Sequence, residues 1–283
     1  MLLSCGVHTI DLSSPVVMGV LNVTPDSFSD GGQFLDPEEA IRQARRMAAE
    51  GAAIIDVGGE STRPGAEAVD ATEELDRVLP VVRAITAELA VPVSVDTSKP
   101  EVMEAVLAAG ASMINDVQAL TAPGAMEAVA GSQAAVCLMH MQGMPRTMQA
   151  DPRYDDVVRD VHQFLSGRIR ACETAGIDRS RLVMDPGFGF GKTLEHNLAL
   201  LATLDLFTRD GLPVRAGLSR KSMIGQLTGR SAGQRLAGSV ALAAIAANHG
   251  ASIIRAHDVA ATVDAVRIGA AVRRWRPAEG NEA

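Results

Sequence analysis

Gly51-Ala52-Ala53-Ile54-Ile55-Asp56 is the stretch that decides the fold, because the chain uses the same plan three times. The plan recurs in Gly110-Ala111-Ser112-Met113-Ile114-Asn115 and in Gly250-Ala251-Ser252-Ile253-Ile254-Arg255. In each copy a helix-ending glycine precedes two small residues, a short apolar run and then a polar residue. Each copy therefore predicts the end of a helix, a buried strand, and a polar side chain where that strand ends.

Short apolar runs alternate with longer segments of helical period along the chain. The predicted strands are residues 16–21, 53–57, 92–96, 112–115, 134–139, 181–185, 213–217 and 252–255. Pro37, Glu38 and Glu39 after Asp36 predict the start of a helix, and Gly51 predicts its end. Eight strand–helix units in 283 residues predict a (β/α)8 TIM barrel of the α/β class. A doubly wound open sheet is the alternative, but no Gly-x-Gly-x-x-Gly motif follows the first strand.

The chain contains no segment that resembles a linker, so residues 1–283 are predicted to form a single domain. Residues 1–14 precede the first predicted barrel strand, and we expect them to form an extra element that covers the bottom of the barrel. Residues 276–283 are expected to form a flexible tail.

Composition excludes several classes of protein. The formal net charge of −8 and the scattered basic residues argue against a nucleic-acid surface. Cys5, Cys137 and Cys172 lie far apart without a Cys-x-x-Cys pair, which argues against a disulfide framework or a structural zinc site and fits a reducing cytoplasm. No apolar stretch approaches membrane-spanning length. Leu2-Leu3-Ser4-Cys5 is not interpreted as a lipoprotein signal, because neither a basic segment nor an adequate apolar run precedes it.

Polar and charged residues collect where the predicted strands end, which is where a (β/α)8 barrel carries its catalytic groups. The segments that follow the eight strands are residues 22–32, 58–65, 96–99, 115–116, 139–143, 185–192, 219–222 and 255–258. Seven of these strand ends carry a charged side chain within a few residues, although a purely structural barrel could use inert turns there. This distribution predicts an active-site rim.

The sixth strand end has the composition of a site for a flat ligand. In Asp185-Pro186-Gly187-Phe188-Gly189-Phe190-Gly191-Lys192 three glycines alternate with two phenylalanines after an acidic residue. Glycine allows close approach of the backbone, the rings offer stacking faces, and the carboxylate can accept paired hydrogen bonds from an amidine-like edge. Only three of the 26 basic side chains are lysines. Lys221 fits a site that needs a compact ammonium group, whereas Lys99 and Lys192 are interpreted as loop charges.

From the residues alone, ordinary structural roles stay open beside the functional ones. Asp96 and Asp185 could cap the helices that follow them, and Lys221 could be a surface charge. Asn22 could be a turn residue before Thr24 and Pro25.

Three further side chains are interpreted in the same way. Arg63 could be a solvated loop residue. His140 fits a hydrogen-bonded histidine at a strand end better than it fits a ligand-binding group. Asp56 is assigned mainly to structure, because the loop after it already carries functional candidates.

Residues 22–30, 58–65, 185–192 and 219–222 resemble the signature segments of bacterial dihydropteroate synthases. The resemblance runs from about residue 16 to residue 259, in the order of the family. It implies a barrel enzyme of folate biosynthesis, which joins 6-hydroxymethyl-7,8-dihydropterin diphosphate to 4-aminobenzoate and releases pyrophosphate. Mg²⁺ as cofactor, a homodimer formed through late helices such as residues 231–248, and a cytoplasmic location are implied as well.

The resemblance also implies roles for individual residues. Catalysis is assigned to Asp96, Asp185, Lys221 and Arg255. The pterin is expected against Asp96, Asn115, Met139, Asp185, Phe190, Gly217, Lys221 and Arg255. The diphosphate is expected at Asn22, Arg63, Arg255 and His257, with Asn22 as the direct Mg²⁺ contact. The aminobenzoate is expected at Phe28, Thr62, Arg63, Pro64, Phe190, Lys221 and Ser222.

Two other functions are compatible with a pterin-binding barrel. A methyltransferase that binds methyltetrahydrofolate would lack the loops for aminobenzoate and diphosphate, and Thr62-Arg63-Pro64 argues against it. A pterin-binding protein without catalytic activity would have lost the contacts to an anionic ligand. Asn22, Arg63, Arg255 and His257 are all present, which favours the synthase.

Overall fold

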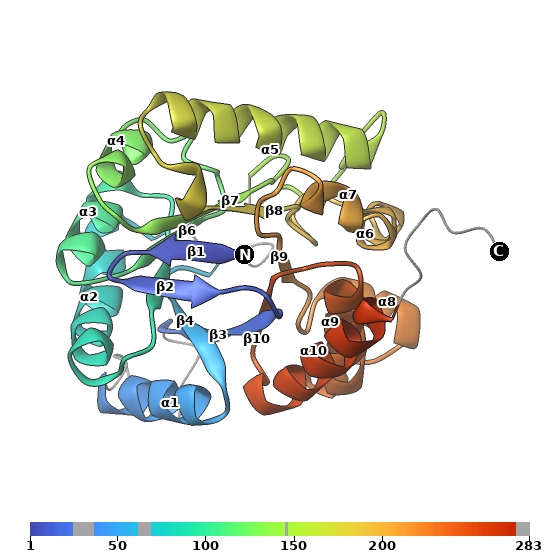
Figure 1. Cartoon of the computed structure of the whole chain (residues 1–283), viewed down its shortest axis with the longest axis horizontal. Helices are drawn as coiled ribbons and strands as arrows, with labels where there is room; N and C mark the ends of the chain where they lie inside the picture. The colour runs from blue at the N-terminus through green and yellow to red at the C-terminus, as the bar shows by residue number, and fades with distance from the viewer. Residues whose placement is uncertain (25–36, 62–68, 145–146, 276–283) are drawn as a thin grey trace.

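Eight parallel strands form a nearly closed barrel with helices on its outside, as the sequence predicts (Figure 1). The structure is a computed structural model that describes residues 1–24, 37–61, 69–144 and 147–275. The barrel strands are β3 (Val16–Asn22), β4 (Ala52–Gly58), β5 (Val93–Asp96), β6 (Met113–Asp116), β7 (Ala135–Met139), β8 (Leu182–Asp185), β9 (Arg215–Gly217) and β10 (Ile253–Ala256). Their order around the barrel is β8-β7-β6-β5-β4-β3-β10-β9. Each predicted strand is present, with bounds shifted by one or two residues.

Helices connect the successive strands, which is the arrangement that parallel neighbours require. They are α1 (Pro37–Ala49), α2 (Ala71–Glu88), α3 (Pro100–Ala108), α4 (Ala125–Ala130), α5 (Val157–Thr174), α6 (Leu194–Ala202), α7 (Asp205–Thr208), α8 (Ser222–Thr228), α9 (Leu236–Asn248) and α10 (Val259–Arg274), with short 3₁₀ turns η2 (Arg179–Arg181) and η3 (Ala232–Gln234). Gly51, Gly110 and Gly250 have φ angles of +99°, +99° and +97° after α1, α3 and α9. This left-handed conformation favours glycine and explains the repeated motif.

The barrel has its fewest backbone hydrogen-bonded pairs between β8 and β9, the two ends of the strand order. These strands are joined by one isolated bridge, between Met184 and Val214. The amide of Met184 donates to the carbonyl of Pro213 at 2.9 Å. The predicted strand 213–217 is shortened to β9 because Pro213 has no amide hydrogen to continue a ladder. We call this junction the seam.

A two-stranded hairpin lies against the amino-terminal end of the barrel. Its strands β1 (Leu2–Cys5) and β2 (His8–Asp11) are antiparallel, and Figure 1 shows the hairpin in blue in front of the barrel strands. The thiol of Cys5 donates to the carbonyl of Ser112 at 3.2 Å, immediately before β6. Apolar hairpin residues and inward-facing strand residues form one buried cluster: Leu3, Cys5, Ile10, Leu12, Met18, Ile54, Met113, Ala135, Cys137, Val183 and Ile253. This cluster fills the bottom of the barrel and leaves the polar strand ends at the other side.

All three cysteines are free and buried. Burial raises the pKa of Cys5 to about 12 and that of Cys172 to about 11, so both stay protonated thiols. Among the described residues, no helix combines the length and the apolar character that crossing a membrane requires.

Candidate active site

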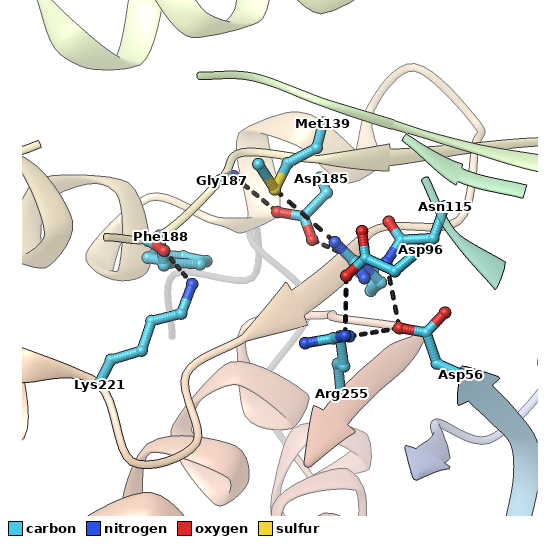
Figure 2. A network of polar contacts seen from close by, with 10 residues as sticks. Asp56, Asp96, Asn115, Met139, Asp185, Gly187, Phe188, Lys221 and Arg255 are labelled. Carbon is cyan, nitrogen blue, oxygen red and sulfur yellow. Dashed lines mark hydrogen bonds and ion pairs between the residues drawn. The ribbon is translucent and has the colours of Figure 1, made fainter. Parts of the chain in front are cut away.

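Arg255 is the centre of a hydrogen-bonded network inside the barrel (Figure 2). Its Nε donates to Asp56 Oδ2 at 2.6 Å, and its Nη2 donates to Asp96 Oδ2 at 2.9 Å. Asn115 Nδ2 donates to the same oxygen of Asp56 at 3.1 Å. These four residues, which we call the Arg255 network, come from β10, β4, β5 and β6. Side chains that are distant in sequence meet because these strands end on the same side of the barrel.

The Arg255 network places two buried carboxylates against one guanidinium. Burial raises the pKa of Asp96 to about 7, the positive charge of Arg255 opposes that rise, and the neighbouring Asp56 adds to it. A carboxyl group with a pKa near neutrality can change protonation when a ligand binds, which is typical of functional sites. The interpretation of Asp56 as mainly structural missed this network, in which Asp56 is fully buried. The repeat held the signal, since Asp56, Asn115 and Arg255 occupy the same position in its three copies.

Asp185 forms a second buried pair, with Arg215. Asp185 Oδ1 accepts from the Gly187 amide at 2.6 Å, and Oδ2 accepts from Arg215 Nε at 2.5 Å. Arg215 Nη2 also lies 3.8 Å from Met139 Sδ. Sequence reasoning missed Arg215, although its position two residues before Gly217 predicts a side chain on the same inner face of the strand.

Glycines bring the loops after β7 and β8 into contact. Gly187 has a φ of +71°, and a Cβ there would lie 1.9 Å from the carbonyl oxygen of His140. Gly191 has a φ of +61°, and its Cβ would lie 2.3 Å from the carbonyl oxygen of Gln142. The alternating glycines of this segment are therefore needed both for backbone conformation and for close approach.

Lys221 reaches the same loop from the N-terminus of α8. Its Nζ donates to the carbonyl of Phe188 (Figure 2). The same Nζ lies 4.4 Å from the centroid of the Phe190 ring. Burial lowers the pKa of Lys221 to about 7, the negative charge of Asp185 opposes that fall, and Arg215 adds to it. An anionic ligand would favour the protonated form of this lysine.

The sequence interpretation of Lys192 and Lys99 as loop charges missed the contacts that both side chains make. Lys192 is buried, and its Nζ lies 3.0 Å from His140 Nδ1 and donates to the Phe190 carbonyl at 3.0 Å. Burial lowers the pKa of Lys192 well below its ordinary value. Lys99 is half-buried and makes ion pairs with Glu60 and Glu74. Both lysines bind neighbouring segments together, because a buried amino group must find hydrogen-bond partners.

His140 is a buried, hydrogen-bonded histidine at a strand end, as predicted. Burial, and secondarily the charge of Lys192, lowers the pKa of His140 to about 3. The ring is therefore neutral, and its Nδ1 can accept from Lys192.

The remaining candidates divide into described and undescribed residues. His257 follows β10, and its Nδ1 lies 3.0 Å from Ser219 Oγ. A Cβ on Gly58 would lie 3.6 Å from Asn22 Oδ1 and 3.7 Å from the Cβ of Asp96, so Asn22 lies beside the Arg255 network. Gly217 adjoins Arg255, and Ser222 is the exposed first residue of α8. Phe28, Thr62, Arg63 and Pro64 lie outside the described residues.

The comparisons with known proteins agree with this geometry. The family model described as pterin binding enzyme matches residues 18–257. The dihydropteroate synthase of Escherichia coli K12 is 55% identical over 260 residues, which are 92% of each chain. This chain belongs to the dihydropteroate synthase family. It is therefore an enzyme of the transferase class.

Solved structures of the same family have the same fold. A Xanthomonas albilineans dihydropteroate synthase with 4-aminobenzoic acid has a TM-score of 0.91 and 55% identity, covering 98% of this chain and 99% of that one. A structure from the same organism in complex with 7,8-dihydropteroate has a TM-score of 0.87 and 52% identity, covering 98% of this chain and all of that one. The resemblance that the four segments carry thus extends over nearly the whole of this chain.

Proposed function

We propose that this family member joins 6-hydroxymethyl-7,8-dihydropterin diphosphate to 4-aminobenzoate, giving 7,8-dihydropteroate and pyrophosphate. The observation that carries the proposal is the concentration of buried, incompletely paired polar groups inside the barrel. Asp56 Oδ1, Asn115 Oδ1 and Ser94 Oγ are buried and have no hydrogen-bond partner within residues 1–24, 37–61, 69–144 and 147–275. Buried polar atoms without partners are costly, so these atoms support a polar ligand or ordered waters in the interior.

A dihydropterin ring matches this set of groups. The ring presents N3–H and a 2-amino group side by side, and these two donors suit one carboxylate. Each oxygen of Asp185 has one protein partner and keeps acceptor capacity for them. Asn115 and Asp96 would bind the other edge nitrogens, and Lys221 would donate to the ring carbonyl or N5. Met139 and Phe190 would pack on the faces of the ring.

The same arrangement supports departure of the diphosphate. In the proposed reaction the carbon–oxygen bond to the diphosphate breaks with its electron pair on oxygen. The amine nitrogen of aminobenzoate then forms the new bond to carbon and loses a proton to solvent. Arg255, Arg63 and His257 would neutralise the leaving group, and Asn22 would help to hold it. Asp96 and Asp185 would stabilise the positive charge that develops on the pterin. An aryl amine is already neutral at pH 7, so no strong general base is needed.

The residues present fit a Mg²⁺ ion that is held mainly by the diphosphate. Mg²⁺ takes oxygen ligands and usually combines substrate phosphates and waters with one or two protein groups. The described residues contain no group of three or more His, Cys, Asp and Glu side chains that could hold a metal by themselves. The amide oxygen of Asn22 is the proposed protein ligand. When bound, the ion would neutralise charge on the diphosphate.

We also propose that the enzyme is a cytoplasmic homodimer. Exposed apolar side chains gather on the last helices and just after them: Leu227, Leu236, Ile245, Ile268, Val272 and Trp275. A second copy would remove these side chains from water, which supports an interface through α9 and α10. The free, buried cysteines support a reducing compartment.

The proposal is tested by pyrophosphate release from the dihydropterin diphosphate with Mg²⁺, in the presence and absence of 4-aminobenzoate. We expect release that depends on aminobenzoate and yields dihydropteroate. Lys221→Ala should lower kcat/KM by at least about 100-fold, the scale of removing one charged donor from a preorganised site. Arg83→Ala, an exposed residue of α2, is the control and should retain activity. Pterin binding without any turnover would instead indicate a binding protein.

A further inference from the structure

Arg215 is a buried arginine that the proposed mechanism leaves without a role. It is 3% exposed, and its Nε donates to Asp185 Oδ2 at 2.5 Å. Its Nη2 contacts Met139 Sδ at 3.8 Å, whereas its Nη1 is buried and has no hydrogen-bond partner in the part of the chain that the structure describes. Arg215 thus contacts two residues that are assigned to the pterin. It also retains a buried donor that no described protein group satisfies.

The position of this arginine is unusual because it bridges the seam of the barrel. Asp185 ends β8 and Arg215 begins β9, and these strands share only one isolated backbone bridge. Elsewhere around the barrel, consecutive backbone pairs position the strands. At the seam, the ion pair between Asp185 and Arg215 supplies an additional connection. The orientation of the Asp185 carboxylate therefore depends on a side chain rather than on a continuous ladder.

The charge of Arg215 also matters for the carboxylates of the interior. The ionisable groups that surround the pair are Asp56 on β4, Asp96 on β5, Cys137 on β7, Lys192 in the loop after β8, Lys221 at α8 and Arg255 on β10. Arg255 is already shared by Asp56 and Asp96. Arg215 is the cation in direct contact with Asp185, and it also lowers the pKa of Asp96.

We infer that Arg215 is a positioning residue for pterin recognition, which holds the Asp185 carboxylate in place across the seam. This inference rests on the proposed function. A protonated carboxyl group would present a donor to the two donors of the pterin edge and would lose an acceptor site. The pair therefore sets the direction of the Asp185 carboxylate, and the charge of Arg215 also favours the ionised form of Asp96.

The test measures binding of 6-hydroxymethylpterin, which carries no leaving group, between pH 5 and pH 8 by titration calorimetry. We expect Arg215→Met to weaken ring binding about 10- to 100-fold at pH 7.5, the scale of a lost hydrogen bond to a charged group. The pH below which binding is lost should also move upward, because Arg215 no longer lowers the pKa of Asp96. Arg215→Lys keeps the charge, so its affinity should fall while that pH limit stays near the wild-type value.

Arg181→Met is the matched control, because Arg181 is also buried but lies before the other end of β8. Its guanidinium donates to the Ala134 carbonyl at 2.7 Å, far from the strand ends that carry the site. This variant should lose stability and keep the affinity and pH limit of ring binding.

Three outcomes decide the inference. It is overturned if Arg215→Met loses stability as Arg181→Met does but binds the ring normally at every pH. If Arg215→Met does not fold, the comparison of Arg215→Lys with Arg215→Gln decides. An equal pH limit in these two variants would show that the charge has no role. Asp185→Asn tests the proposed function separately. If the wild type binds the ring and this variant binds it equally well, the assignment of Asp185 to the pterin is contradicted.

Discussion

Asp96 shares one guanidinium with Asp56, and both carboxylates are buried. At the scale of single residues, this arrangement lowers the stability of the ligand-free enzyme, because two buried carboxylates must share one positive charge. The folded protein holds the Asp96 carboxyl at a pKa of about 7, mainly because burial disfavours its charged form. Ligand-binding groups are often kept in such environments, since a bound substrate can supply the missing interactions.

Asp96→Asn should therefore change stability in a pH-dependent way. Because the pKa of Asp96 is raised in the folded state, the unfolded chain ionises first. The wild-type free energy of unfolding thus falls as pH rises from about 4 to about 7. Asparagine does not titrate, so the stability of the variant relative to wild type should increase across this window. Urea unfolding at pH 5 and pH 8 measures the effect.

The control for this prediction is Asp76→Asn, an exposed position on α2. Its effect on the free energy of unfolding should be the same at both pH values. A pH-independent difference between Asp96→Asn and wild type would contradict the raised pKa. Dihydropteroate formation by the Asp96 variant should fall in either case.

At the scale of elements, the site depends on loops that touch. The segments after β7 and β8 meet where Gly187 faces the carbonyl of His140. Lys192 strengthens this contact, because its Nζ donates to the same carbonyl at 3.3 Å and lies 3.0 Å from His140 Nδ1. Gly187 and His140, the two residues in this contact, are far apart in the sequence. The pattern of glycines predicts a tight loop, but it does not identify the backbone that approaches it.

Gly187→Ala should be much more damaging than Gly229→Ala. Gly229 has a φ of +70° and nothing within 4 Å of a Cβ, so its substitution should cost about 1 kcal/mol of left-handed strain. Gly187 has a φ of +71°, but its Cβ would lie 1.9 Å from a backbone oxygen. We expect a cost of roughly 3 kcal/mol or more, together with weaker pterin binding, because the loop must move. Equal costs in denaturant unfolding would contradict this packing.

At the scale of the whole molecule, α9 and α10 expose several large apolar side chains to solvent. Ile268 and Val272 are 64% and 55% exposed, and Trp275, the only tryptophan of the chain, is 88% exposed. Isolated exposed apolar residues are ordinary, but a group of them on neighbouring helices suggests an interface.

Ile268→Asp should shift the proposed homodimer toward monomer, because a charge in an apolar interface loses its hydration. Light scattering during size-exclusion chromatography measures the mass. In the wild type, dilution should shift the emission of Trp275 to longer wavelength as the indole is exposed. Val7→Asp, at the 95% exposed turn of the hairpin, is the control and should remain dimeric. A wild-type protein that is monomeric at all concentrations would refute the interface.

Much of this protein follows from local sequence. The strands and helices are set by apolar period and by glycines such as Gly51, Gly110 and Gly250, because these signals act over a few residues. The strand ends that carry Asp96, Asn115, Asp185 and Arg255 follow from the barrel topology, and the family follows from segments with a specific order. Local signals sufficed for these features because each depends on neighbours in the chain.

Only the tertiary structure decided which groups pair. The fold pairs Asp56 with Arg255 and buries Lys192 against His140. It also joins Arg215 to Asp185 across the seam. A charged residue carries no local mark of its partner or of its burial. Those properties arise when strands far apart in sequence close into one barrel, and desolvation then sets which charges the interior must pair.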